Sequence, residues 1–140
     1  MRFSSSNSTT KEWSINAAKQ TYHIDHWSGG YFDIDKEGYV VSNANPENCS
    51  LNIRLSDVIK EAQQKNLRTP ILIRFKDILH HRVQKINSAF DKAIVEFNYK
   101  NKYRGVFPIK VNQLREVVEE ILGAGKPYQI GLEVGSKPEL

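Results

Sequence analysis

The 140 residues have a mass of 16.1 kDa, and 39% of them are hydrophobic and 26% charged. This length accommodates one domain of ordinary size, and no apolar run approaches the roughly 18 residues that a membrane-spanning helix needs. A single cysteine, Cys49, excludes an internal disulfide, so we expect a soluble chain in the cytoplasm.

The net charge of +4 and the pI of about 9.2 raise the question of nucleic-acid binding. Between Arg54 and Arg104 there are 12 Lys and Arg against 5 Asp and Glu, a local charge of +7, and the rest of the chain carries −3. These charges are spread singly along two helical patterns and a loop, and the basic cluster at 100–104 is short. We therefore interpret them as solvated helix faces, with a surface that follows phosphates as the alternative.

The beginning of the chain predicts a leader and a small arm. Residues 1–11 are polar and lack the apolar stretch of a signal peptide, so we expect a disordered leader. Residues 12–50 are rich in aromatic and turn-forming residues and are expected to form an arm that packs on something larger. Within this arm we expect a helix over 15–22 capped by Ser14, and a hairpin over 31–41.

From residue 51 onward the pattern alternates between helix and strand. This order implies parallel strands joined by crossover helices. A complete (β/α)8 barrel typically needs about 250 residues, so we expect 51–140 to be the first, incomplete part of an α/β barrel of this TIM-like kind, preceded by the small α/β arm. The predicted order is a helix from Leu55 to Ala62 with Ser56 as its N-cap, strand 70–75, helix 78–97, strand 103–111, helix 114–122, strand 128–134 and a further helix opened by Ser136.

Lys110 is the candidate catalytic residue that the sequence singles out. It lies near the end of the apolar segment 103–111, and ligands of parallel α/β folds bind at the carboxyl ends of strands. Apolar surroundings lower the pKa of a lysine because its charged form loses hydration, and such an amine can attack a carbonyl to form a Schiff base. The alternative is a strand-end lysine that extends to water. Pro108 is also unusual within a strand because it has no N–H to donate.

Four segments, in this order, closely resemble the biosynthetic arginine decarboxylases. They are WSGGYFDI (27–34), PILIRFKDIL (70–79), YRGVFPIKVNQ (103–113) and GLEVGSKPEL (131–140). That family consists of pyridoxal-phosphate enzymes of the alanine-racemase and ornithine-decarboxylase fold group, and the resemblance extends from about Trp13 to Leu140.

The resemblance implies a carboxy-lyase that converts L-arginine into agmatine and carbon dioxide, a step of arginine catabolism at the entry to polyamine and spermidine biosynthesis. It implies that Lys110 holds pyridoxal phosphate as a Schiff base. Glu133 corresponds to an acidic residue that faces the cofactor pocket and favours the protonated lysine, and Glu139 to another acid lining that pocket. Solvent-facing carboxylates are the alternative for both.

The resemblance also implies Mg²⁺ as a further cofactor, for which no residue here is assigned as a ligand. The full-length form is expected to be a homo-oligomer with active sites at the dimer interface, without nucleic acid or membrane as a partner. The residues that select the substrate are expected beyond Leu140. The resemblance also implies that the family's glycine-rich phosphate cradle, the acid that binds the pyridine nitrogen and the cysteine from the partner subunit fall outside these residues, so we expect the 140 residues alone to be inactive.

Several other functions remain open. The nearest is a related decarboxylase acting on ornithine, lysine, diaminopimelate or carboxynorspermidine. A non-catalytic regulatory relative and a basic nucleic-acid-binding module are the others, and the presence of Lys110 argues against the former.

The remaining polar features receive structural interpretations. Asn112 is expected to be the N-cap of the helix that follows the lysine. His23 and His26 have no further metal ligands nearby in the sequence, and His80 and His81 are expected to be an exposed pair on a helix. Cys49 has no histidine partner and is not expected to be a nucleophile. Gly29 and Gly30 are expected to form a turn rather than a phosphate-binding loop.

Overall fold

In a computed structural model of the protein, residues 12–47 and 52–140 are described. The chain divides into two compact units, Met1–Thr69 and Pro70–Leu140. The predicted leader and Cys49 lie outside the described residues. The predicted domain limits, with a boundary after residue 50, stay a prediction. Within the described ranges, no helix is both long and apolar enough to cross a membrane.

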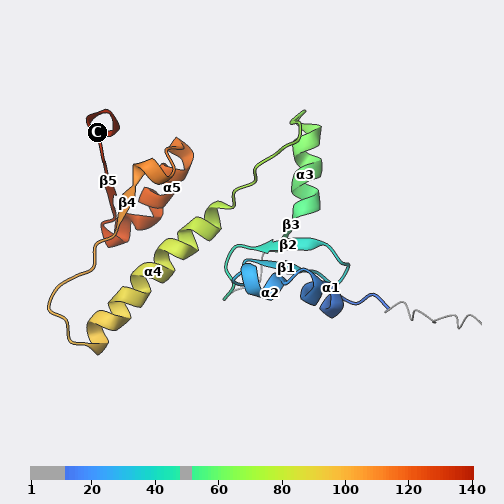
Figure 1. The fold of residues 1–140 in the computed structure, drawn as a ribbon, viewed down its shortest axis with the longest axis horizontal. Helices are drawn as coiled ribbons and strands as arrows, with labels where there is room; N and C mark the ends of the chain where they lie inside the picture. The colour runs from blue at the N-terminus through green and yellow to red at the C-terminus, as the bar shows by residue number, and fades with distance from the viewer. Residues whose placement is uncertain (1–11, 48–51) are drawn as a thin grey trace, which may run out of the picture. The chain divides into compact units, whose positions relative to one another are not determined.

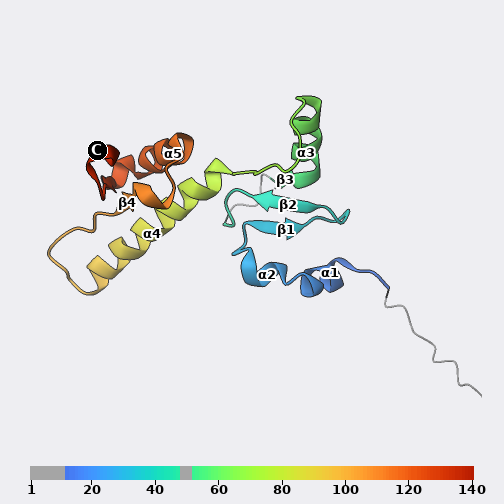
Figure 2. The same ribbon diagram turned by 45° about the horizontal axis from the view of Figure 1, so that its top comes forward.

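The N-terminal unit contains a three-stranded antiparallel sheet with helices near its two edges (Figure 2). Its elements are α1 (Ile15–Thr21), α2 (Ile24–Trp27), β1 (Phe32–Ile34), β2 (Val40–Asn43), β3 (Asn52–Arg54) and α3 (Leu55–Gln64). β2 is the central strand and pairs with β1 and β3. α1 and α2 contact β1, and α3 contacts β2 and β3. The apolar core of the unit consists of Ile24, Tyr31, Ile34 and Val41, and the polar residues Ser28, Ser42 and Asn43 are buried as well.

The turn between β1 and β2 confirms the predicted hairpin. Asp35 Oδ1 accepts the backbone N–H groups of Glu37 and Tyr39, both at 2.9 Å, so one carboxylate closes the turn. Gly38 has a φ of +89°, a conformation that only glycine adopts readily. A Cβ at Gly38 would also lie 3.2 Å from the Trp13 ring, so the aromatic residue covers the turn.

The two predicted caps in this unit have different outcomes. Ser14 is the N-cap of α1, because its Oγ accepts the Ala17 N–H at 3.1 Å, as predicted. The prediction for Ser56 is wrong, since α3 begins at Leu55 and Arg54 occupies the N-cap position. The physical reason is that β3 leads directly into α3, which leaves no loop residue between them.

Arg54 ties β3, a strand that the sequence did not predict, to the hairpin turn. Its guanidinium lies 2.6 Å from Asp35 and 2.9 Å from Glu37, and 4.7 Å above the centre of the Tyr39 ring. Desolvation acts to raise the pKa of Asp35, but hydrogen bonds from Tyr39, Glu37 and Arg54 outweigh it and lower that pKa. The same ion pairs raise the pKa of Arg54 against its own desolvation.

The C-terminal unit contains a two-stranded parallel sheet with two helices beside it (Figure 1). Its elements are α4 (Lys76–Glu96), β4 (Val106–Pro108), the single 3₁₀ turns η1 (Ile109–Val111), η2 (Lys126–Tyr128) and η3 (Lys137–Glu139), α5 (Arg115–Gly125) and β5 (Gly131–Glu133). α5 connects the parallel strands, and α4 and α5 pack side by side. Val117 and Ile121 of α5 are buried, as their apolar spacing predicts.

The predicted strand over 70–75 is wrong for this structure. The segment runs into α4 without forming a strand, although Ile71, Ile73 and Phe75 are partly buried. A parallel strand is held by hydrogen bonds to its neighbours. β4 pairs with β5 at one edge, and no strand pairs with its other edge in the part of the chain that is described. The structure is therefore a mixed helix and sheet arrangement with two of the three expected parallel strands.

The remaining strands and caps are shorter or shifted relative to the prediction. The strand expected over 103–111 ends at Pro108, after which the chain turns into η1. The strand expected over 128–134 is reduced to β5, because η2 occupies its start. Asn112 is not the N-cap of α5, which is Leu114, but its Oδ1 accepts the Leu114 N–H at 3.1 Å and shapes the approach to the helix. At the chain's end, Ser136 opens η3 and not an α-helix.

Candidate functional site

Lys110 lies directly after the carboxyl end of β4. It is the middle residue of η1, and its side chain is exposed. Among the described residues, its amine has no hydrogen bond or ion pair. The prediction that Lys110 sits within a strand is therefore wrong by two residues, since Pro108 ends the ladder. The apolar enclosure invoked for the lysine is also absent in this part of the protein.

Glu133 is brought to the same end of the sheet as Lys110. It is the last residue of β5 and stands opposite Pro108 in the parallel register. Because parallel strands have their carboxyl ends at one edge, Glu133 and η1 lie at the same end of the sheet. Glu133 is exposed, and no described residue forms a hydrogen bond or ion pair with its carboxylate. η1 and β5 thus present the Lys110 amine and the Glu133 carboxylate at the same end of the sheet, and neither group has a partner among the described residues.

Glu139 has a local structural contact. Its Oε2 accepts the Gly135 N–H at 2.6 Å, which closes the turn between β5 and η3. The side chain is partly buried. Glu139 therefore follows the same strand end as Glu133, but its carboxylate is already engaged by the backbone.

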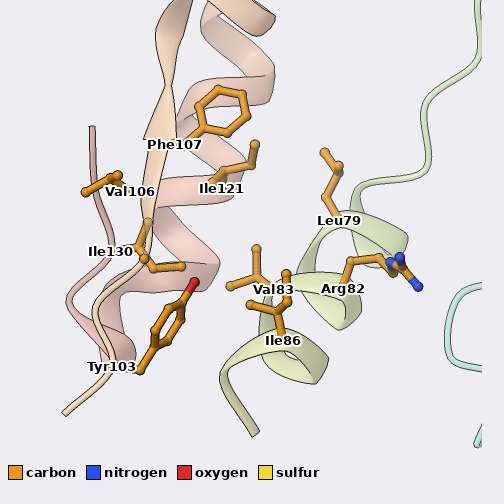
Figure 3. A pocket seen from close by; sticks show the side chains of 10 residues that line it. Leu79, Arg82, Val83, Ile86, Tyr103, Val106, Phe107, Ile121 and Ile130 are labelled. Atoms are coloured by element: carbon orange, nitrogen blue, oxygen red, sulfur yellow. The ribbon is translucent and has the colours of Figure 1, made fainter. Parts of the chain in front are cut away.

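An apolar cavity of about 250 Å³ lies beside this region but does not include the three predicted site residues. Figure 3 shows Leu79, Val83 and Ile86 of α4 facing Phe107, Ile121 and Ile130 across it. Tyr103 closes one side, and its ring stacks on Phe90 at 3.7 Å between ring centres. The cavity is a gap in the packing between α4 and the sheet, and apart from Tyr103 and Arg82 the side chains that line it are apolar.

Glu120 is the charged residue that sequence reasoning missed. Its two oxygens lie 2.5 Å from Lys76 Nζ and 2.7 Å from His80 Nε2, so it joins α5 to the start of α4. These hydrogen bonds lower the pKa of the Glu120 carboxyl, while desolvation opposes the shift. The same contact raises the pKa of Lys76. No local pattern could have signalled this contact, because Glu120 is 40 residues or more from both partners.

The remaining histidines and glycines have structural roles. His80 and His81 are partly buried rather than exposed, so the prediction of an exposed pair is wrong. His23 and His26 meet edge to face at 5.7 Å. Nowhere in 12–47 or 52–140 do three or more His, Cys, Asp or Glu gather as a metal site would require. The expected turn at Gly29 and Gly30 is confirmed, since both have positive φ.

Comparison with known proteins shows which sequences this chain resembles. The chain is 49% identical over 129 residues to the biosynthetic arginine decarboxylase of Alkalilimnicola ehrlichii, covering 92% of this chain and 20% of that protein. It is 44% identical to the one from Shewanella frigidimarina, covering 92% of this chain and 21% of the relative. No family model matches the sequence.

The structure gives the same result. It superposes on the crystal structure of the biosynthetic arginine decarboxylase SpeA from Campylobacter jejuni with a TM-score of 0.76 and 35% identity, covering 84% of this chain and 19% of that one. This chain is homologous to part of the biosynthetic arginine decarboxylases. It spans about a fifth of the length of these arginine decarboxylases, and its fold resembles their N-terminal part.

Proposed function

We propose that this chain is part of an arginine decarboxylase that converts L-arginine into agmatine and carbon dioxide with pyridoxal phosphate held at Lys110. The observation that carries the proposal is the position of Lys110 at the carboxyl end of β4, within a chain similar to arginine decarboxylases over most of its length. Ligands of parallel α/β folds bind at this end of the strands.

The Lys110 amine at the carboxyl end of β4 fits the proposed cofactor. An aldehyde cofactor requires an accessible primary amine, and the Lys110 amine is exposed with no partner in the described ranges. When bound, pyridoxal phosphate supplies an electron sink for the charge left behind by a departing carboxylate. The protein's part is to hold the cofactor and substrate, exclude water and move protons.

Glu133 is proposed to act on the Lys110 amine. A carboxylate at the same strand end favours the protonated amine and orients it by charge. Glu139 is proposed to shape the pocket by holding the backbone at Gly135, since its Oε2 already accepts that N–H. A direct contact of Glu139 with a ligand would require this hydrogen bond to be exchanged.

We further propose that β4 and β5 are neighbouring strands of a (β/α)8 barrel. The parallel pairing, the α5 crossover and the edge of β4 that no described strand pairs with support this arrangement. Val106 of β4 is 62% exposed, and such an apolar side chain is covered when a parallel sheet has both faces packed.

The wider context of the enzyme is proposed on the same similarity. On this basis we propose that the protein acts in the cytoplasm, in polyamine and spermidine biosynthesis, as part of a homo-oligomer whose active sites lie at the dimer interface. Mg²⁺ is proposed as a further cofactor on the resemblance alone, and no residue is assigned as its ligand.

The proposal is tested with a chain extended to the length of the relatives. Pyridoxal phosphate is added, the covalent link to the protein is fixed with borohydride, and the labelled peptide is mapped by mass spectrometry. Lys110 should carry the label, and Lys110→Ala should abolish both the label and agmatine production. Lys92→Ala is the matched control, because Lys92 is also an exposed lysine of the C-terminal unit without a partner among the described residues. Labelling of another lysine in the wild-type protein would refute the site.

The substrate is tested by measuring carbon dioxide release from L-arginine, L-ornithine, L-lysine, diaminopimelate and carboxynorspermidine. Arginine should have the highest kcat/KM. A higher value for any of the others, together with labelling at Lys110, would keep the site but overturn arginine as the substrate.

A further inference from the structure

A polar cavity of about 290 Å³ lies at the amino ends of β4 and β5. Its lining comes from the second half of α4 and from the segments at 101–104 and 127–129, which lead into these strands. Lys110 and Glu133 lie at the carboxyl ends of the same strands. The cavity is therefore at the opposite end of the sheet from the proposed cofactor site.

A buried amide lies in the lining of this cavity. Asn87 is 2% exposed and is the buried residue of α4. Its Nδ2 donates to the Val83 carbonyl at 2.8 Å. Within the described parts of the chain, its carbonyl oxygen and its second N–H have no partner. The carbonyl oxygen is not among the described side-chain atoms that are fully buried without a partner, so it reaches the cavity and can bond to water or to a polar ligand there.

Charges of both signs line the same cavity without neutralising one another. Lys102 and Arg104 line the cavity and belong to the short basic cluster at 100–104. Asp91 lies one helical turn after Asn87 and also lines the cavity. None of these three side chains forms an ion pair with any described residue.

We propose that this cavity binds a small zwitterion of the α-amino acid type. Lys102 and Arg104 would bind its carboxylate, Asp91 its ammonium group, and the Asn87 amide a remaining polar atom. A simple anion would have Asp91 beside it and a simple cation would face two positive charges, whereas a zwitterion satisfies all three groups. The volume is near the lower limit for small-molecule pockets, which suits a ligand of few atoms.

The test is a nuclear magnetic resonance titration of the ¹⁵N-labelled 140-residue chain with three probes. L-Alanine carries both charges, whereas propionate and ethylammonium carry one each. L-Alanine should shift the signals of the Asn87 side-chain amide and of the backbone at 91 and 101–104, with saturation at concentrations about tenfold lower than either single-charge probe, as expected for one added charge-assisted contact.

Three variants separate the roles of the charges. Asp91→Asn should weaken L-alanine binding to the level of propionate, and the double variant K102Q/R104Q should weaken both L-alanine and propionate. Lys100→Gln is the matched control, because Lys100 belongs to the same basic cluster but bonds to Asn98 and does not line the cavity. The control should bind L-alanine like the wild type, and circular dichroism should show that every variant is folded.

Two results would overturn the proposal. Equal affinity for L-alanine and propionate would make the cavity a plain anion site, and the absence of saturable shifts with all three probes would mean that it holds only water. Neither result depends on pyridoxal phosphate or on decarboxylase activity, so the outcome is independent of the proposed function.

Discussion

Two glycines near the end of α5 should respond in opposite directions to alanine, although they are only two residues apart. A Cβ added to Gly123 would have no atom within 4 Å. A Cβ added to Gly125 would lie 2.7 Å from the Cβ of Ile130 and 2.8 Å from its Cδ1, closer than side-chain carbons approach. Gly125 has a φ of −82°, so the contact and not the backbone angle requires glycine there.

The magnitudes follow from these two environments. Replacing glycine by alanine inside a helix stabilises it by about 0.5–1 kcal/mol, because the unfolded chain loses conformational freedom. Gly123→Ala should show this gain. Gly125→Ala forces Ile130 away from α5 at the point where the chain enters β5, and overpacking of this kind costs about 1–3 kcal/mol. We therefore expect the two variants to differ by about 1.5–4 kcal/mol.

The assay is urea unfolding of the 140-residue chain followed by far-ultraviolet circular dichroism, with hydrogen exchange of the α5 amides as a residue-specific check. Tryptophan fluorescence is unsuitable, because both Trp13 and Trp27 belong to the N-terminal unit. If Gly125→Ala proves as stable as Gly123→Ala, the close packing of α5 on Ile130 is wrong. If Gly123→Ala also loses stability, the open space beside it is wrong.

Three further predictions test other parts of the structure. Ser14→Ala should destabilise α1 by about 1 kcal/mol, because the Ala17 N–H loses its acceptor. Hydrogen exchange of the Ala17 amide should become faster. An unchanged exchange rate would contradict the role of Ser14 as the N-cap. Glu120 has a lowered pKa when folded, so its contribution to stability is present above its ordinary pKa of 4.5 and is lost as the pH falls through the lower, folded value. Urea midpoints measured across that range should therefore depend less on pH in Glu120→Gln, and an unchanged pH dependence would contradict the Lys76 contact. The 140 residues alone, given pyridoxal phosphate and L-arginine, should release no carbon dioxide, because the described residues do not enclose Lys110; measurable release would contradict this reasoning.

Local signals in the sequence were sufficient for most helices and for the hairpin. Ser14 caps α1 through a contact three residues away, and the hairpin turn is closed by Asp35 within four residues. The apolar spacing of Val117 and Ile121 likewise identifies the buried face of α5. Such features involve neighbours along the chain, so their physical causes are visible before any tertiary contact is known.

The candidate site was predicted in part. The sequence placed Lys110 at a strand end, and the structure places it directly after β4. The sequence also placed Glu133 on the next parallel strand, and the register with Pro108 brings it to the same end. The described residues do not form the apolar enclosure expected for Lys110, which stays a prediction, because enclosure depends on what packs around a residue and not on its immediate neighbours in the chain.

The sequence by itself determined most of the helices, the hairpin, the place of Lys110 close to a strand end and the similarity to arginine decarboxylases. Only the tertiary structure decided which segments pair: β3 joins β2 unexpectedly, whereas 70–75 finds no partner in spite of its apolar residues. It also revealed the contacts of Glu120 and the burial of Asn87. The physical reason is that strand pairing, ion pairs and burial depend on residues distant in the chain, whereas caps, turns and helical periodicity depend on residues within a few positions.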